Sequence, residues 1–464
     1  MIRTRFAPSP TGPLHIGGLR TALFNFLFAK QANGEFYLRI EDTDRVRSKK
    51  EWEIEIFENL KKLGIIWDNE AERQSERGEI YKSYLEKMLK EGTAYYCFCT
   101  KEELDKEREE LMKMEKAPVH QGKYRNLGLE KALKKIEEGE KCVIRFKCPL
   151  NKDISFDDLI RGKIKINTSD IGDFVIAKDL NNPLYNFTCV IDDFEMDITH
   201  IIRGEEHIPN TPKQILLGEA LGFTIPNFAH LSLILGKDKR KLSKREGSTA
   251  VSDYLRQGYL PKAINNFIAF LGWNPGTEKE IYSMDELIQD FSINKISKSG
   301  AIFNIDKLDW MNGMYIRKMD INELVQKCLP YLKQKEGIDN KKVVEAYKDR
   351  LKKLEDIAEL TDYLYQDMLN YDKELLRWKD MTDEEIKESL NNALKLIEHA
   401  DNIQIELIEE AKKAPSIGSF MWPLRVALSG KKASAGPAEI IEIIGKEKAI
   451  IRIKQAINYL CLEK

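Results

Sequence analysis

Apolar and polar positions in the first part of the chain fall into two kinds of segment. Short apolar runs over residues 3–7 and 36–40 are typical of buried parallel strands. Apolar residues recur with helical spacing over residues 19–33, and a second helix is expected over residues 48–63. This strand–helix order predicts an α/β fold with a Rossmann-like parallel sheet.

The pattern changes at about residue 93. A strand over residues 95–99 and a charged helix over residues 101–116 indicate an α+β insertion between two halves of the sheet. Further elements of the insertion are expected around residues 142–148 and 163–166, which are strand-like. The sheet resumes with apolar runs that we interpret as strands, at residues 173–177, 183–193, 198–206 and 230–235, with a helix over residues 211–221.

Beyond Val251 the chain is dominated by helical patterns with charged, solvent-facing sides. Residues 320–464 show no strand alternation, which predicts an all-α region. The predicted organisation is a first catalytic half (1–92), an insertion (93–172), a second catalytic half (173–235), a domain that carries a lysine-rich loop (236–319) and a helical region (320–464).

Composition narrows the class of protein. The 464 residues carry a net charge of −2, so a basic footprint for nucleic acid over the whole surface is missing, although local patches can still bind phosphates. Seven scattered cysteines do not form the framework of a secreted disulfide protein. No apolar run reaches membrane-spanning length, and Met1 leads directly into the first motif without room for a signal peptide. We therefore expect a cytoplasmic protein that does not enter a membrane.

The stretch from Pro8 to Gly18 joins the first strand to the first helix. Its prolines and Gly12 favour a turn, and Gly17 and Gly18 allow close backbone approach where the helix begins. Free N–H groups at a helix N-terminus bind anions, and His15 can donate a hydrogen bond to a phosphate. The residues alone therefore predict a phosphate site.

Two motifs carry a resemblance to a known family. Residues 8–18 read Pro-Ser-Pro-Thr-Gly-Pro-Leu-His-Ile-Gly-Gly and residues 241–245 read Lys-Leu-Ser-Lys-Arg, which resemble the two signatures of class I aminoacyl-tRNA synthetases. Phe-Ala-Pro-Ser-Pro-Thr-Gly at residues 6–12 is similar to the form found in glutamyl-tRNA synthetases. Residues 303–313 resemble the stem-contacting domain of that family, and residues 422–428 and 436–439 its C-terminal helical domain.

The resemblance implies an ATP site with Mg²⁺ brought in by the nucleotide. An alternative for the lysine-rich loop is a solvated charge run, but the loop follows a buried-looking strand and is bracketed by glycines, as expected for a mobile lid. His15, Lys241 and Lys244 are the implied catalytic residues. The implied ATP-binding residues are Pro8, His15, Gly17, Gly18, Lys241, Ser243 and Lys244.

The resemblance also implies a glutamate site, formed by Arg5, Ser9, Glu41, Tyr185, Cys189 and Arg203. Two guanidinium groups on strands of one sheet suit a carboxylate substrate, although the ordinary alternative for Arg203 is a surface ion pair. Glu41 is expected at the α-amino group. For the nearby Asp42 and Asp44, the alternative to a functional role is that they cap the helix over residues 48–63. We expect this capping role of Asp44.

Cys97-Phe-Cys99 raises the possibility of zinc, because some bacterial members of the family use such a pair with a second ligand pair about two dozen residues on. Residues 123–127 contain no cysteine, and His120 would supply a third ligand where a structural site needs four. We therefore predict no structural zinc, no metal-ligating residues, and two buried structural thiols.

The implied function is ATP-dependent attachment of L-glutamate to tRNA(Glu) through a glutamyl-adenylate. One alternative is an enzyme that also charges tRNA(Gln) with glutamate. A glutaminyl-tRNA synthetase is disfavoured by Ser9 and Thr11 in the first motif, and by the helical pattern after residue 320. A shortened relative lacks the anticodon-binding region, and a non-catalytic tRNA-binding paralogue has no need of both ATP motifs. No P-loop sequence is present, and a monomer is expected.

Overall fold

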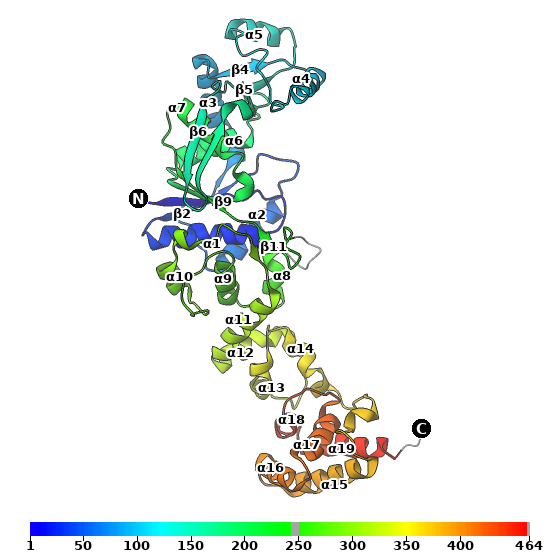
Figure 1. Ribbon diagram of the computed structural model, residues 1–464. Helices are drawn as coiled ribbons and strands as arrows, with labels where there is room; N and C mark the ends of the chain where they lie inside the picture. The colour runs from blue at the N-terminus through cyan, green and yellow to red at the C-terminus, as the bar shows by residue number, and fades with distance from the viewer. Residues whose placement is uncertain (243–249, 462–464) are drawn as a thin grey trace. The chain divides into compact units, whose positions relative to one another are not determined.

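The structure is a computed structural model that describes residues 1–242 and 250–461. The chain forms two compact units (Figure 1). The first consists of residues 1–255 and 261–305, and the second of residues 256–260 and 306–464. The predicted phosphate site and glutamate site both lie in the first unit.

A parallel three-stranded sheet begins the first unit, in the order β1 (Arg3–Phe6), β2 (Glu35–Ile40), β3 (Glu72–Arg73). Helix α1 (Ile16–Gln31) connects β1 to β2 and packs on both, and α2 (Lys50–Lys62) follows β2. The strand–helix order predicted from apolar periodicity is confirmed. Parallel strands place their carboxyl ends at one edge, where α/β folds bind ligands.

A four-stranded sheet adjoins the first, in the order β7 (Gly162–Asn167), β6 (Asp153–Asp158), β10 (Asn227–Leu231), β9 (His200–Gly204). The β9, β10 and β6 strands run parallel, and β7 is antiparallel to β6. The two sheets meet where the Thr199 N–H donates to the Arg3 carbonyl at 2.9 Å. Arg5 and Arg203 therefore lie on β1 and β9 of adjoining sheets, and the expectation that they share one sheet is wrong.

A smaller antiparallel sheet has the order β4 (Ala94–Cys97), β5 (Val143–Phe146), β8 (Val175–Ala177), and its first two strands lie in the inserted region (Figure 1). The prediction that the strand at residues 173–177 resumes the catalytic sheet is wrong, because β8 pairs with β5. Helices α3 (Gly78–Glu91), α4 (Lys101–Lys113) and α5 (Leu129–Glu137) accompany it. Its apolar core is continuous with that of the catalytic part, because Ile144 of β5 belongs to the same buried cluster as Phe187 and Leu217.

The segment predicted as a strand over residues 183–193 is wrong in type: it is helix α6 (Tyr185–Glu195). A short apolar run fits a buried strand and a buried helix equally well, and only packing decides between them. The helix predicted at residues 211–221 is confirmed as α7 (Thr211–Leu221), and α6 packs beside it. The last predicted strand is divided into β10 and β11 (Ile234–Leu235), and β11 pairs with β12 (Ala301–Ile302).

The rest of the chain is largely helical. In the first unit α8 (Val251–Arg256), α9 (Pro261–Ala269) and α10 (Met284–Asp290) follow, and α9 and α10 pack on α1. The described residues of the second unit contain helices and turns but no strand, as predicted. Its helices are α11 (Ile305–Lys318), α12 (Ile321–Cys328), α13 (Asn340–Tyr347), α14 (Asp356–Thr361), α15 (Asp383–His399), α16 (Ile403–Lys413), α17 (Ile417–Ser429), α18 (Pro437–Ile444) and α19 (Lys446–Tyr459).

Short 3₁₀ helices connect several of these elements: η1 (Gln74–Glu76), η2 (Thr168–Asp170), η3 (Glu205–His207), η5 (Ile293–Lys295), η6 (Leu329–Tyr331), η7 (Lys348–Arg350), η8 (Asp362–Tyr365) and η9 (Lys373–Leu376). Within the described ranges, none of the helices combines the length and the apolar character that crossing a membrane requires.

Candidate active site

The N-terminus of α1 is capped by His15. Its Nδ1 atom accepts the backbone N–H of Gly18 at 3.0 Å. Although His15 is exposed, desolvation by the surrounding protein atoms lowers the pKa of its ring, which is therefore neutral near pH 7. Because Nδ1 accepts from Gly18, the proton of the ring lies on Nε2. The capping turn thus leaves one N–H of the ring available to a ligand.

Gly17 lies directly against this ring. A Cβ atom on Gly17 would lie 3.1 Å from ring atoms of His15, which is tighter than ordinary contact. The Gly18 amide, predicted to bind a phosphate, is already engaged by Nδ1 of His15. The Pro8 carbonyl accepts the N–H of Glu41 at 3.0 Å, which ties the motif loop to the end of β2.

Residues on both sides of the lysine-rich loop lie at this helix start. Ala250 forms an antiparallel bridge with His15, and the Val251 N–H donates to the Leu14 carbonyl at 2.9 Å. Lys241 is exposed and bridges Leu235 at the end of β11, and its charge also lowers the pKa of His15. Ser243 and Lys244, predicted for the ATP site, lie outside the described residues.

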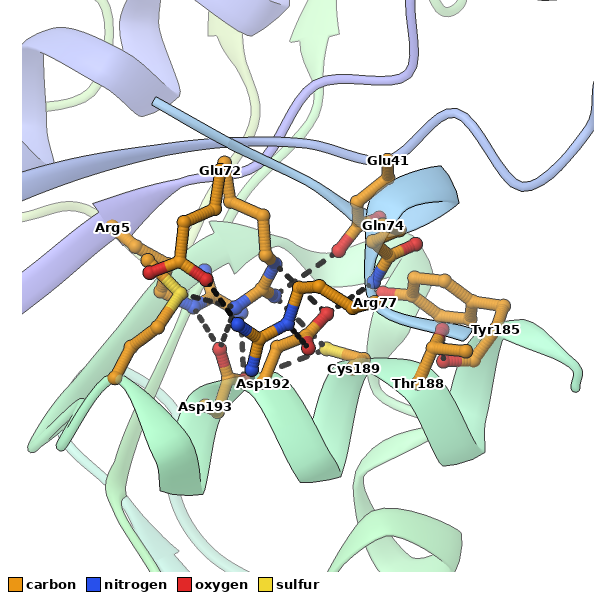
Figure 2. Close-up of polar contacts among 12 residues, drawn as sticks. Arg5, Glu41, Glu72, Gln74, Arg77, Tyr185, Thr188, Cys189, Asp192 and Asp193 are labelled. Carbon is orange, nitrogen blue, oxygen red and sulfur yellow. Dashed lines mark hydrogen bonds and ion pairs between the residues drawn. The ribbon is translucent and has the colours of Figure 1, made fainter. Parts of the chain in front are cut away.

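A buried ion cluster fills the carboxyl end of the first sheet, above α6 (Figure 2). Asp193 on α6 bridges two guanidinium groups: Arg5 Nε lies 3.1 Å and Arg39 Nη1 2.8 Å from its Oδ1. Arg39 also donates to Oε1 of Glu41 at 3.1 Å. Burial opposes ionisation of Asp193, but the two guanidinium charges prevail and lower its pKa to about 2. The sequence alone predicted no role for Arg39 or Asp193.

Asp192, the neighbour of Asp193, anchors the other side of the cluster. Its carboxylate is fully buried and accepts hydrogen bonds from Gln74 at 2.7 Å, Arg77 at 2.8 Å and Tyr81 at 2.9 Å. Figure 2 shows Gln74 and Arg77 meeting Asp192 from the segment that follows β3. The cluster therefore fixes α6 against the first sheet and holds Arg5 and Glu41 in place.

The predicted glutamate-site residues of α6 lie on the face that meets this cluster. Tyr185, Cys189 and Asp193 are spaced by four residues, so their side chains share one side of the helix. Burial raises the pKa of Cys189 to about 12, so its thiol is neutral and donates to Asp193 Oδ2 at 3.4 Å. Burial also raises the pKa of Glu41, in spite of the opposing charges of Arg39 and Arg5.

Arg203 is buried, and the surface ion pair considered for it is wrong. Its Nη2 atom donates to Thr211 Oγ1 at 2.7 Å and to Gln214 Oε1 at 2.8 Å. Its Nη1 atom is buried without a hydrogen-bond partner in the described structure. No carboxylate of the described residues lies within ion-pair distance of Arg203, so none of them neutralises its charge.

Five of the six predicted glutamate-site residues share one neighbourhood. Burial raises the pKa of the Tyr185 hydroxyl. Cys189 and Glu41 raise this pKa further, and the charges of Arg203 and Arg5 lower it. The Tyr185 hydroxyl is hydrogen-bonded to Nδ1 of His207 at 3.2 Å. The sixth residue, Ser9, is an exposed loop residue whose carbonyl accepts the Thr11 N–H at 2.8 Å.

The capping role expected of Asp44 is wrong. Helix α2 begins at Lys50 with Lys49 as N-cap, and no side chain caps it. Asp44 instead accepts from Nε of Arg47 at 2.6 Å. Asp42 accepts from the backbone N–H and the hydroxyl of Ser75, at 2.8 and 2.6 Å, and so ties the loop after β2 to η1.

Cys97, Cys99 and His120 are the group in the described part of the chain that could hold a metal ion, with ligand atoms within 4.8 Å of one another. His120 Nε2 lies 3.6 Å from Cys97 Sγ, and its Nδ1 lies 2.6 Å from Oε2 of Glu107. Burial opposes ionisation of Cys97, but its hydrogen bonds lower its pKa to about 7. The group offers three ligands where structural zinc takes four, and the absence of zinc stays a prediction.

Comparison with known proteins places these features in a family. Residues 1–310 match the catalytic domain of tRNA synthetases class I (E and Q), and residues 323–457 match an anticodon binding domain. A glutamate–tRNA ligase of Carboxydothermus hydrogenoformans is 46% identical, with 99% of this chain and 100% of that protein covered. One from Aquifex aeolicus is 46% identical, with 99% of each chain covered.

A solved structure agrees with the sequence relatives. The crystal structure of a glutamate tRNA ligase from Elizabethkingia meningosepticum in complex with its amino acid has a TM-score of 0.87 and 37% identity, and the comparison covers 99% of each chain. The chain therefore belongs to the class I tRNA synthetases (E and Q), and within them to the family of glutamate–tRNA ligases.

Proposed function

We propose that the chain attaches L-glutamate to the 3′ end of tRNA(Glu) with ATP as the energy source. The observation that carries this proposal is the buried Arg203 Nη1, which has no partner in the described structure and lies near Tyr185 with Arg5 and Glu41. A buried cationic donor without a partner suits a substrate carboxylate, since Arg binds carboxylates through its fork of N–H groups.

The reaction has two steps. An oxygen of glutamate's α-carboxylate attacks the α-phosphorus of ATP, and pyrophosphate leaves with the electrons of the broken P–O bond. A ribose hydroxyl at the tRNA terminus then attacks the carbonyl carbon of glutamyl-adenylate, loses its proton and releases AMP. Both steps depend on positioning and charge stabilisation rather than on a protein nucleophile.

Glutamate is held by residues of opposite charge. Arg203 and Arg5 bind the side-chain carboxylate, and Glu41 accepts from the α-amino group. Tyr185 and Cys189 line the same place, with Ser9 contributed by the motif loop. Because Asp193 already pairs with Arg5, Arg203 supplies the charge that the protein leaves unneutralised. A neutral glutamine side chain would leave this charge buried and unpaired, which disfavours it.

ATP is bound at the start of α1. Nε2 of His15 donates to a phosphate oxygen, beside the N–H of Gly17, and the Gly18 amide acts through His15 by fixing its tautomer. Pro8 shapes the loop, and Lys241, Ser243 and Lys244 bind the phosphates, with the two lysines stabilising charge that develops in the transition state. Mg²⁺ enters with the nucleotide.

The remaining parts of the chain bind tRNA in this proposal. The insertion contacts the acceptor end, residues 236–319 contact the stem, and the helical region from residue 320 recognises the anticodon. The proposed enzyme acts as a cytoplasmic monomer. Whether its second substrate is tRNA(Glu) alone, or tRNA(Gln) as well, is an outcome of the following experiment.

The test is aminoacylation with ATP and labelled glutamate or glutamine, using purified tRNA(Glu) and tRNA(Gln) in separate reactions. We expect glutamate on tRNA(Glu), with loss of charging in Lys244→Ala and retention in Lys62→Ala, an exposed lysine of α2. Glutamate on both tRNAs would define the broader substrate range. Glutamine charging would contradict the role of Arg203, and no charging of any kind would reject the proposed function.

A further inference from the structure

Arg203 is held by a set of neutral acceptors on neighbouring elements. Two of them, Thr211 and Gln214, belong to α7 and accept from Nη2. The third is His230, whose Nε2 accepts from Nε of Arg203 at 3.3 Å. His230 and Arg203 are directly opposite each other on the parallel strands β10 and β9. The sheet register therefore sets the imidazole against the guanidinium.

Behind His230 lies a buried carboxylate. Nδ1 of His230 is 2.6 Å from Oδ2 of Asp158, and both side chains are fully buried. Oδ1 of Asp158 also accepts the backbone N–H groups of Ile160 at 2.9 Å and Arg161 at 2.7 Å. Burial opposes ionisation of Asp158, but these hydrogen bonds lower its pKa. Burial lowers the pKa of His230, so the pair consists of a carboxylate and a neutral imidazole.

The protonation state of Asp158 and His230 decides which atoms donate and which accept in the hydrogen bonds around Arg203. Since Asp158 accepts from Nδ1–H, Nε2 of His230 carries no proton and is an acceptor. The Thr211 hydroxyl has two acceptors in reach, and His230 Nε2 at 3.0 Å is nearer than the His207 carbonyl at 3.3 Å. When Thr211 donates to His230, its oxygen lone pairs face Nη2 of Arg203.

We propose that Asp158 and His230 are positioning residues of the glutamate pocket, which orient Arg203 through Thr211 and through its own Nε while leaving its charge for the substrate carboxylate. This inference rests on the proposed function and deepens it. Asp158 acts at a distance: it fixes the imidazole, and the imidazole fixes the guanidinium. A carboxylate in direct contact with Arg203 would compete with the substrate, as Asp193 competes at Arg5.

Asp158 lies in the same sheet as Arg203, at the end of a different strand. Asp158 is the last residue of β6, which with β7 forms a hairpin in the segment predicted as the insertion, and it pairs in register with Phe228 of β10. The hairpin thus extends the sheet that carries Arg203. The hairpin that supports Arg203 is therefore distant in sequence from the two motifs at residues 8–18 and 241–245.

The test replaces His230 by two amides that reproduce different halves of the ring. His230→Asn places an amide near Nδ1 and retains donation to Asp158, but it has no acceptor at the position of Nε2. His230→Gln reaches the position of Nε2 and supplies an acceptor oxygen. His200→Gln is the matched control, since His200 lies on β9 and its ring contacts Phe28 rather than Arg203.

We expect the KM for glutamate in aminoacylation to rise about ten- to a hundredfold in His230→Asn, as for a weakened hydrogen bond to a charged group. The kcat at saturating glutamate and the KM for ATP should change less than about threefold. The reason is that the weakened contact holds glutamate equally in the ground state and in the transition state. His230→Gln should recover most of the affinity for glutamate, and His200→Gln should match wild type.

Two results would overturn the proposal: an unchanged KM for glutamate in folded His230→Asn, or an equal loss of glutamate affinity, ATP affinity and kcat in both amide variants. If His230→Asn does not fold, Thr211→Val and Thr211→Ser make the same comparison, because only serine keeps the hydroxyl. Equal KM values for glutamate in those two variants would also overturn it. A wild-type protein that does not charge glutamate rejects the proposed function instead.

Discussion

The backbone N–H of Gly18 donates to Nδ1 of His15 at 3.0 Å, so one side chain both caps α1 and presents Nε2–H at the helix N-terminus. The two roles use different ring atoms. Substitutions can therefore separate the contribution of His15 to folding from its proposed role in ATP binding.

His15→Asn should retain stability and lose activity. Asparagine is a good N-cap, so the temperature of unfolding should stay within about 2 °C of wild type. The lost Nε2–H should lower kcat for aminoacylation about a hundredfold, as for removal of one donor to a developing anion. His15→Ala should show the same kcat and in addition lose about 1 kcal/mol of stability. Equal rates in His15→Asn and wild type would contradict the phosphate role.

Arg5 and Arg203 should respond differently to replacement by methionine. Arg203→Met removes an unneutralised charge, so the KM for glutamate should rise at least about a hundredfold with the preference over glutamine reduced. Arg5→Met also removes a partner of buried Asp193, so the free energy of unfolding should fall by about 3 kcal/mol. Urea unfolding and initial charging rates measure both effects. A larger loss of stability in Arg203→Met would reverse this assignment.

Asp193 should contribute to the acid sensitivity of the protein. Although burial opposes its ionisation, Arg5 and Arg39 depress the pKa of Asp193 to about 2 in the folded state. Its stabilisation is therefore fully present above the ordinary carboxyl pKa of about 4 and is lost as pH falls toward 2. The stability difference between wild type and Asp193→Asn should shrink between pH 6 and pH 2.5. The exposed control Asp105→Asn should show no such convergence, and a constant difference for Asp193→Asn would refute the linkage.

Gly122 should contribute to the stability of the inserted region. Its φ of +81° is strained for other residues, and a Cβ there would lie 2.6 Å from Oδ2 of Asp173. That buried carboxylate accepts from Tyr95 at 2.8 Å and Arg125 at 2.9 Å. Gly122→Ala should cost about 1–3 kcal/mol in thermal unfolding. Gly128→Ala, at a position with open space, is the matched control, and equal stability of the two variants would contradict the argument.

The local sequence pattern was sufficient to predict elements whose structure depends on residues close together in the chain. Strands β1 and β2, helices α1 and α7 and the helical second unit lie where the apolar pattern predicted them, because apolar runs and their spacing mark the segments that the fold buries. The motif glycines and His15 also lie together in sequence, so their meeting at the start of α1 was predictable. The family resemblance named Arg5, Glu41, Tyr185, Cys189 and Arg203, but it did not supply the partners that hold them.

Only the tertiary structure decided those partners. The apolar run at residues 183–193 fits a strand or a helix, and its packing as α6 is what brings Asp193 to Arg5, 188 residues away in sequence. The Asp158–His230 pair likewise forms because β6 joins β10 across 72 residues. Buried charges require specific partners to compensate for lost hydration, and no local pattern encodes which distant residue meets that need.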